Sequence, residues 1–185
     1  MTQIALALAL SVLALPLAAE TLDGPHPDAP PETAQFAFLI GEWHCVIRSM
    51  GPDGETSERR ASWVGSWDLG GWAIRDDWTS QLPGGATFHG FNIRSFNIRT
   101  GKWDNRWLQS GDLRWKDYEA EKVGETMVMT GGEGRDANGD FIERNTFHDI
   151  GELSWRWRKD RSYDGGETWI EGVALIEATA VNPQG

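Results

Sequence analysis

A regular series of glycine-rich turns constrains this chain more than any other feature of its sequence. Such steps occur at residues 51–55, 68–71, 82–85, 99–102, 136–140 and 163–166. Asp-Gly and Asn-Gly steps supply the positive φ angles that tight hairpin turns need. Because short connections can join only antiparallel neighbours, we expect the chain to fold as a succession of β-hairpins.

The runs between these turns alternate apolar and polar residues with a period of two. In WAIRDDW, the side chains of Trp72, Ile74, Asp76 and Trp78 share one face, and KWDNRWLQ and SWRWRK repeat the pattern. This period, combined with aromatic enrichment, is typical of β-strands. We predict about ten strands, at residues 42–49, 59–68, 72–80, 86–98, 102–110, 113–121, 125–131, 140–149, 152–161 and 168–179.

The number of strands and the shortness of their connections indicate the fold class. Ten hairpin-linked strands with one polar face remove their exposed edges most simply by closing on themselves. We therefore predict an all-β fold, a closed or nearly closed antiparallel up-and-down barrel. A β-sandwich is the alternative. A short helical turn at 31–39 is the one helical element expected outside the N-terminal run.

The N-terminal region carries the pattern of an exported protein. Residues 4–19 form an apolar run that ends in small residues, with Ala18 or Ala19 as the expected cleavage point. We interpret residues 1–19 as a secretory signal peptide, since a membrane span needs about 20 apolar residues. A membrane anchor is the alternative. Residues 20–35 are predicted to be an extended, proline-rich lead-in, and 36–180 a single barrel domain in a periplasmic or secreted protein.

The charge and the cysteine content exclude some partners and cross-links. The net charge of −11 argues against nucleic acid and anionic membrane surfaces as partners. We expect no stable membrane insertion after signal cleavage, and the sequence carries no indication of oligomeric state. Cys45 is the only cysteine, so no internal disulfide can form. Its place in a strand-like run favours a buried, inert thiol.

The stretch SYDGGETW at 162–169 matches the Asp-box pattern of β-propeller blades. A blade takes about 40 to 50 residues and a propeller needs at least four, whereas this motif appears once. We therefore interpret it as a hairpin turn. The Asp164 carboxylate would accept backbone N–H groups across the turn, Gly165 and Gly166 would give backbone freedom, and Trp169 would pack where the next strand begins.

Several short motifs in order resemble a known group of proteins. FLIGEWHC at 38–45 contains Gly41-x-Trp43, which is similar to the G-x-W entry of lipocalins and other calycin barrels. The wider layout resembles a family of bacterial secreted, lipocalin-like domains of unknown function. The motifs that carry this resemblance are Asp76-Asp77-Trp78, Gly90 through Phe96-Asn97 to Thr100-Gly101-Lys102-Trp103, then Trp107 and the S-x-DGG-x-TW turn.

This resemblance covers roughly residues 36–180, and the chain departs from it in two places. Phe96-Asn97 stands where many members carry Tyr-Asp, and Leu108-Gln109 stands where an acidic residue is common. The resemblance implies a lipocalin-like barrel and an export signal. It implies no activity.

A search for catalytic and cofactor motifs finds none. The chain has no G-x-S-x-G, no H-E-x-x-H and no phosphate-binding loop. His89, His148 and Glu143 do not show a recognised metal-ligand spacing. We therefore expect no cofactor and no metal.

Tryptophan is the remaining unusual feature, with eleven Trp against seven Phe and two Tyr. Trp combines a large apolar face with one N–H donor, which suits a pocket for a polar guest. The candidate ligand-binding residues are the aromatic Trp78, Trp107, Trp155 and Trp157, with Asp76, Asn105, Arg144 and His148 to orient the ligand. The alternative is that tryptophan only fills the core. A slip of one residue in strand phase would turn any of these side chains outward.

Three functions are compatible with this architecture. The leading hypothesis is a barrel that binds a small, partly apolar molecule in its interior. An enzyme on the same barrel, an isomerase, lyase or hydrolase, would use Asp76 or Glu143 with His148 as acid and base. A packed structural or interaction module is the third. A filled interior would favour the module, an interior His–carboxylate pair the enzyme, and an open interior lined by Trp the binding protein.

Overall fold

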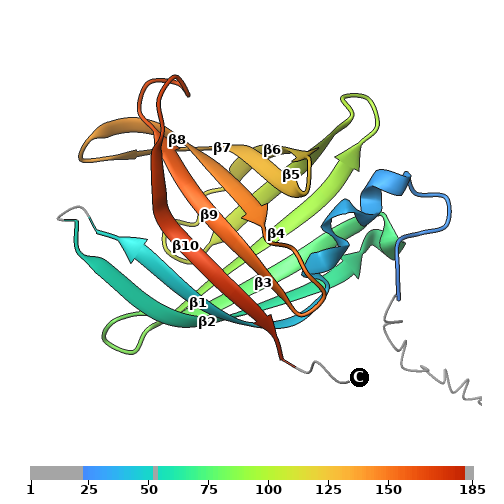
Figure 1. The fold of residues 1–185 in the computed structure, drawn as a ribbon, viewed down its shortest axis with the longest axis horizontal. Coiled ribbons are helices and arrows are strands. Elements are labelled where there is room, and N and C mark those ends of the chain that lie inside the picture. Colours follow the sequence, from blue (N-terminus) through green and yellow to red (C-terminus); the bar gives the residue numbers. More distant parts are fainter. Residues whose placement is uncertain (1–22, 52–53, 182–185) are drawn as a thin grey trace, which may run out of the picture.

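The computed structural model describes residues 23–51 and 54–181, which form one β-barrel (Figure 1). The predicted signal peptide at 1–19 lies outside the described residues. The ten strands are β1 (Gly41–Met50), β2 (Thr56–Asp68), β3 (Ala73–Gln81), β4 (Thr87–Asn97), β5 (Lys102–Gln109), β6 (Lys116–Val123), β7 (Thr126–Asp136), β8 (Gly139–His148), β9 (Ser154–Ser162) and β10 (Ile170–Ala180). Each predicted strand is present, with bounds shifted by a few residues.

The sheet is antiparallel throughout and closes on itself. Every strand pairs with its neighbours along the chain, and β1 completes the circle by pairing with β10, from Trp43 opposite Ala180 to Ser49 opposite Ala174. The predicted closed up-and-down barrel is therefore confirmed. Closure leaves no unpaired sheet edge, which removes the main aggregation hazard of a β-fold.

One end of the barrel is plugged by the 3₁₀ helix η1 (Pro31–Leu39) (Figure 1). Pro31 suits the first helical position because its fixed φ angle is helical and its missing N–H is not needed there. Phe36 and Leu39 are fully buried, and Phe36 packs edge-on against Trp103 at 4.9 Å between ring centroids. Burial of these side chains holds the short helix, which could not persist alone. The predicted helical turn at 31–39 is confirmed.

Two contacts fix the plug to the barrel wall. The indole Nε1 of Trp43 donates a hydrogen bond of 3.0 Å to the carbonyl of Leu39. Gly65 of β2 lies so near the plug that an added Cβ would stand 2.0 Å from the Leu39 carbonyl oxygen. The Trp of the G-x-W motif thus helps to close one end, and Gly65, which pairs with Gly41 of the same motif, gives the plug room.

The lead-in before the plug packs on the barrel instead of extending away from it. The backbone N–H of His26 donates to the Gly71 carbonyl at 3.0 Å, and the His26 ring stacks on Trp72 at 4.9 Å. The prediction of an extended lead-in at 20–35 is therefore corrected for residues 23–30, because the turn after β2 offers an aromatic face and a backbone carbonyl to this segment. Residues 31–35 belong to η1.

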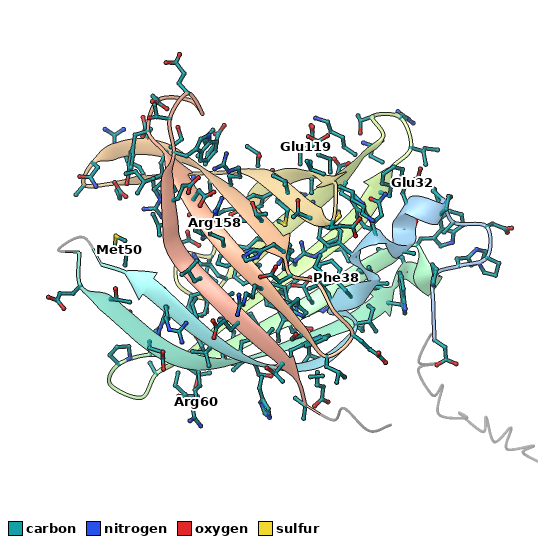
Figure 2. All side chains as sticks on the ribbon, in the orientation of Figure 1. Glu32, Phe38, Met50, Arg60, Glu119 and Arg158 are labelled. Carbon is teal, nitrogen blue, oxygen red and sulfur yellow. The ribbon has the colours of Figure 1, made fainter. Side chains whose placement is uncertain are left out.

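The two ends of the barrel differ because the plug occupies only one of them. The opposite end is a mouth ringed by the hairpins that follow β1, β3, β5, β7 and β9; Figure 2 shows Met50 at this end and Phe38 toward the plug. The described residues contain no helix long and apolar enough to cross a membrane.

The Asp-box stretch forms the hairpin between β9 and β10. The backbone N–H of Thr168 donates to the Asp164 carboxylate at 2.9 Å, and Gly165 and Gly166 have φ angles of 72° and 98°. The interpretation of this motif as a turn is confirmed. Cys45 is also buried as predicted, and burial raises the pKa of its thiol to about 12.

Candidate ligand-binding cavity

The barrel interior contains a cavity of about 350 Å³ toward the mouth. Its wall is mainly apolar and rich in aromatic side chains, with Trp63, Trp78, Trp107, Phe147 and Trp157 among the lining residues. Small-molecule sites in proteins have volumes of roughly 300 to 1,000 Å³. The interior is therefore neither filled by side chains nor an open channel, since the plug and the aromatic cluster below it close the other end.

Six of the eight predicted ligand-binding residues point into the barrel. Trp78, Trp107 and Trp157 line the cavity. Asp76 and Asn105 lie deeper and are each 1% exposed, while Trp155 belongs to the aromatic cluster at the plugged end, with Trp63 at 5.0 Å. The structure thus brings Trp78, Trp107 and Trp157 together around one cavity. The remaining three inward-pointing residues lie between this cavity and the plug.

Arg144 and His148 lie on the outer face, which corrects their predicted placement. Arg144 forms an ion pair of 2.8 Å with Asp160 and covers the ring of Trp169, while His148 lies 3.2 Å from Asp149. The phase of β8 decides this, because buried Phe147 lies on the inner face and side chains alternate between the two faces along a strand. The acid/base pair of the enzyme hypothesis is not assembled, because His148 and the interior carboxylates face opposite sides of the wall.

The floor of the cavity is an ion pair in the middle of the barrel. Arg94 Nε lies 2.7 Å from Asp76 Oδ2, and the same guanidinium donates to Asn105 Oδ1 at 3.0 Å. Asn92 donates to the other Asp76 oxygen at 3.0 Å. Burial raises the pKa of Asp76, against the charge of Arg94 and the hydrogen bonds. Burial of two charges is costly, and these hydrogen bonds compensate for part of that cost. We therefore regard the ion pair as a fixed element of the barrel between the plug and the cavity.

A second polar cluster stands in the wall near the mouth, around Glu143 of β8. Its carboxylate accepts a hydrogen bond from the Tyr118 hydroxyl at 2.8 Å and lies 3.1 Å from Lys159 Nζ and 3.2 Å from Arg161 Nη2. Burial alone would raise the pKa of Glu143, but the charges of Lys159 and Lys116 and these hydrogen bonds outweigh it and lower the pKa to about 2. Glu143 is therefore ionised and its oxygens are occupied.

Lys116 is the least compensated charge in this region. It is the first residue of β6, lines the cavity and is half-buried. Its Nζ lies 6.0 Å from the centroid of the Phe141 ring. Burial lowers the pKa of its ammonium, although the charge of Glu143 opposes this shift. Lys116 forms no ion pair or hydrogen bond with any residue in 23–51 or 54–181.

Three buried polar atoms that belong to cavity-lining residues have no hydrogen-bond partner among the described residues. They are the indole Nε1 of Trp63 and the Oδ1 atoms of Asn92 and Asn145. A buried polar group without a partner costs about 1 to 3 kcal/mol, so such groups are rare in folded proteins. These atoms are buried within the wall, and the side chains that carry them line the cavity.

A glycine shapes one side of the cavity. An added Cβ at Gly90 of β4 would stand 2.2 Å from the Cη2 atom of Trp107. The Trp107 indole therefore occupies the space that a side chain at position 90 would take. The absence of a side chain at position 90 thus allows the Trp107 ring to lie over the backbone of β4.

The sequence analysis missed several interior polar residues, namely Asn92, Arg94, Lys116, Tyr118, Asn145 and Lys159. A usable signal existed for some of them. Lys159 shares the parity of Trp155 and Trp157, and Asn145 shares that of Phe141 and Phe147. Alternating parity would have placed both side chains inside the barrel.

No protein-family model matches this sequence, and no curated protein matches it. The resemblance to lipocalin-like domains therefore depends on the short motifs described above and on the closed barrel.

Proposed function

We propose that this chain is an exported, periplasmic or secreted, lipocalin-like protein that binds a small, partly apolar molecule inside its barrel. The observation that carries the proposal is the cavity of about 350 Å³, whose lining combines aromatic side chains with polar and charged ones. An aromatic wall favours an apolar body through burial of its surface. The polar and charged side chains in the same lining, among them Gln109, Lys116 and Lys159, favour a guest that also carries hydrogen-bonding groups.

The packed structural module is disfavoured by the same observation. A core that serves only stability is filled close to the density of an organic crystal and satisfies its polar groups. An open interior forfeits packing contacts, and the Oδ1 atoms of Asn92 and Asn145 lack hydrogen bonds to the described residues. A ligand that entered through the mouth would recover the packing contacts.

The proposal is tested by blocking the cavity. Ala174 of β10 lines the cavity, whereas its neighbour Leu175 points outward and is 38% exposed. Wild type, Ala174→Phe and the matched control Leu175→Phe would be purified from the native host and analysed by native mass spectrometry. We expect a co-purified small molecule on wild type and Leu175→Phe but not on Ala174→Phe.

A second measurement covers ligands that are lost during purification. The tryptophans of the cavity wall make intrinsic fluorescence a direct reporter of occupancy. A broad panel of small metabolites is expected to include compounds that change this signal in wild type and lose their effect in Ala174→Phe. An empty wild-type protein whose fluorescence does not respond to any panel member would contradict the binding function.

A further inference from the structure

The charges that line the cavity have the opposite sign to the protein as a whole. The chain carries a net charge of −11, yet the charged residues among those lining the cavity are Arg59, Arg94, Lys116 and Lys159, without an Asp or Glu. The overall composition of an acidic protein does not account for a cavity lined by positively charged side chains alone. The reason must therefore lie in the interactions inside the barrel.

The interior carboxylates neutralise only part of this charge. Asp76 compensates Arg94 at the floor. Near the mouth, Glu143 is shared by Lys159 and Arg161, and Arg161 also reaches Asp136 at 2.8 Å. Lys116 faces the same cluster and forms no ion pair with a described residue. Two positive charges beside the cavity, those of the half-buried Lys116 and Arg59, thus form no ion pair with a described residue. Of the two, Lys116 is the one that faces the Glu143 cluster.

A half-buried ammonium without an ion pair has lost part of its hydration, and the nearby charge of Glu143 offsets this loss only in part. Two other features of the site agree with an anionic guest. The oxygens of Glu143 are already occupied by Tyr118, Lys159 and Arg161, which limits the repulsion that this carboxylate would exert. The aromatic wall continues inward from Lys116, so an apolar body could lie behind a charged group.

We propose that the ligand is an amphipathic organic anion, whose negatively charged group binds Lys116 near the mouth and whose apolar body lies among Trp63, Trp78, Trp107 and Trp157. This inference rests on the proposed binding function and specifies its ligand class. A carboxylate on an aromatic or aliphatic body has the required chemistry. Sulfonates and phosphate monoesters share it, and titration of 1-naphthalenesulfonate and 1-naphthyl phosphate beside the carboxylates distinguishes the three classes.

The test compares matched pairs of probes that differ only in charge. The pairs are 1-naphthaleneacetate with 1-naphthaleneacetamide, and decanoate with decanamide, titrated against the mature protein by tryptophan fluorescence and calorimetry. A charge-assisted hydrogen bond to Lys116 should favour the acid over its amide by about tenfold or more. Because this comparison uses wild-type protein, it does not depend on the folding of any variant.

Variants then locate the charged group. Lys116→Met should bring the acid and the amide of each pair to similar affinity, while Lys116→Arg should keep the preference. Lys122→Met is the matched control, since Lys122 lies on the same strand but is exposed and does not line the cavity. It should retain the wild-type preference, and circular dichroism would verify that each variant is folded.

The possible failures are distinguishable. Equal binding of acid and amide to wild type would overturn the anion inference and leave the binding function in place. A preference that survives Lys116→Met would overturn the assignment of the charged group to this lysine. Absence of binding by every probe at millimolar concentration, together with an empty protein from the native host, would overturn both proposals.

Discussion

Arg94 and Asp76 form an ion pair in the middle of the barrel, with 2.7 Å between Nε and Oδ2 and each side chain 1% exposed. The pair separates the aromatic cluster at the plug from the ligand cavity. The Arg94 guanidinium also stands 4.9 Å from the centroid of the Phe36 ring. A charge held at this depth depends on its partner, since water cannot replace a missing carboxylate there.

Removal of that partner should destabilise the protein strongly. We expect Asp76→Ala to lower the free energy of unfolding by about 3 to 5 kcal/mol, because it leaves the Arg94 charge buried and uncompensated. Asp77→Ala is the control, since Asp77 pairs with Arg75 on the outer face with 48% of its side chain exposed. That change should cost about 1 kcal/mol or less. If urea denaturation gives the same loss of unfolding free energy for both variants, the buried ion pair does not stabilise the protein more than the exposed one.

The stability of the barrel should fall in acid through Glu143. Its pKa is lowered to about 2 from an ordinary value of 4.5, so its ionised form is favoured in the folded state. The resulting stabilisation is complete above about pH 4.5 and is lost as the pH falls toward 2, by up to about 3 kcal/mol. Urea denaturation of wild type at pH 7, 5, 4 and 3 would follow this loss.

The Glu143→Gln variant isolates the contribution of this carboxylate to acid sensitivity. It should be less stable at neutral pH, because Lys159 and Arg161 lose their shared partner, but its stability should change less between pH 5 and pH 3. Glu119→Gln on the outer face, where Glu119 pairs with Lys102, should keep the wild-type pH profile. Identical profiles for wild type and Glu143→Gln would contradict the assignment.

Gly90→Ala should disturb the cavity through Trp107. The added Cβ would stand 2.2 Å from the indole, so the ring must move. We expect a loss of about 1 to 3 kcal/mol in the free energy of unfolding, with a shift in tryptophan emission. Gly111→Ala is the control, because its added Cβ comes no closer than 3.5 Å to its neighbours. If the clash is the cause, Trp107→Leu in the Gly90→Ala background should recover part of the stability.

The thiol of Cys45 should be unreactive in the folded protein. It is 2% exposed, and burial raises its pKa to about 12, so almost no thiolate is present at neutral pH. A disulfide reagent should label the Cys45 thiol fully in denaturant. Under native conditions, labelling should proceed only as fast as the barrel unfolds or opens locally. Rapid labelling of the folded protein would contradict the buried position of this residue in β1.

Much of the fold follows from local sequence properties, but the interior does not. The ten strands were predictable because the pleat imposes a period of two and Asp-Gly and Asn-Gly steps form tight turns wherever they occur. The parity of β8 was misjudged at Arg144 and His148, although Phe147 marked the inner face. Arg144 instead pairs with Asp160 on the outer face. The Asp160 carboxylate also accepts a hydrogen bond of 3.0 Å from the backbone N–H of Gly172, and this contact fixes the start of β10.

The sequence by itself determined that the chain forms antiparallel hairpins and that these close into a barrel with aromatic side chains inside. Only the tertiary structure decided that a cavity remains between the plug and the mouth. It also decided that Lys116 faces this cavity without forming an ion pair. The physical reason is that turns and pleats depend on residues close in the chain. Cavity volume and charge compensation depend instead on side chains from β2 to β10 that meet only when the barrel closes.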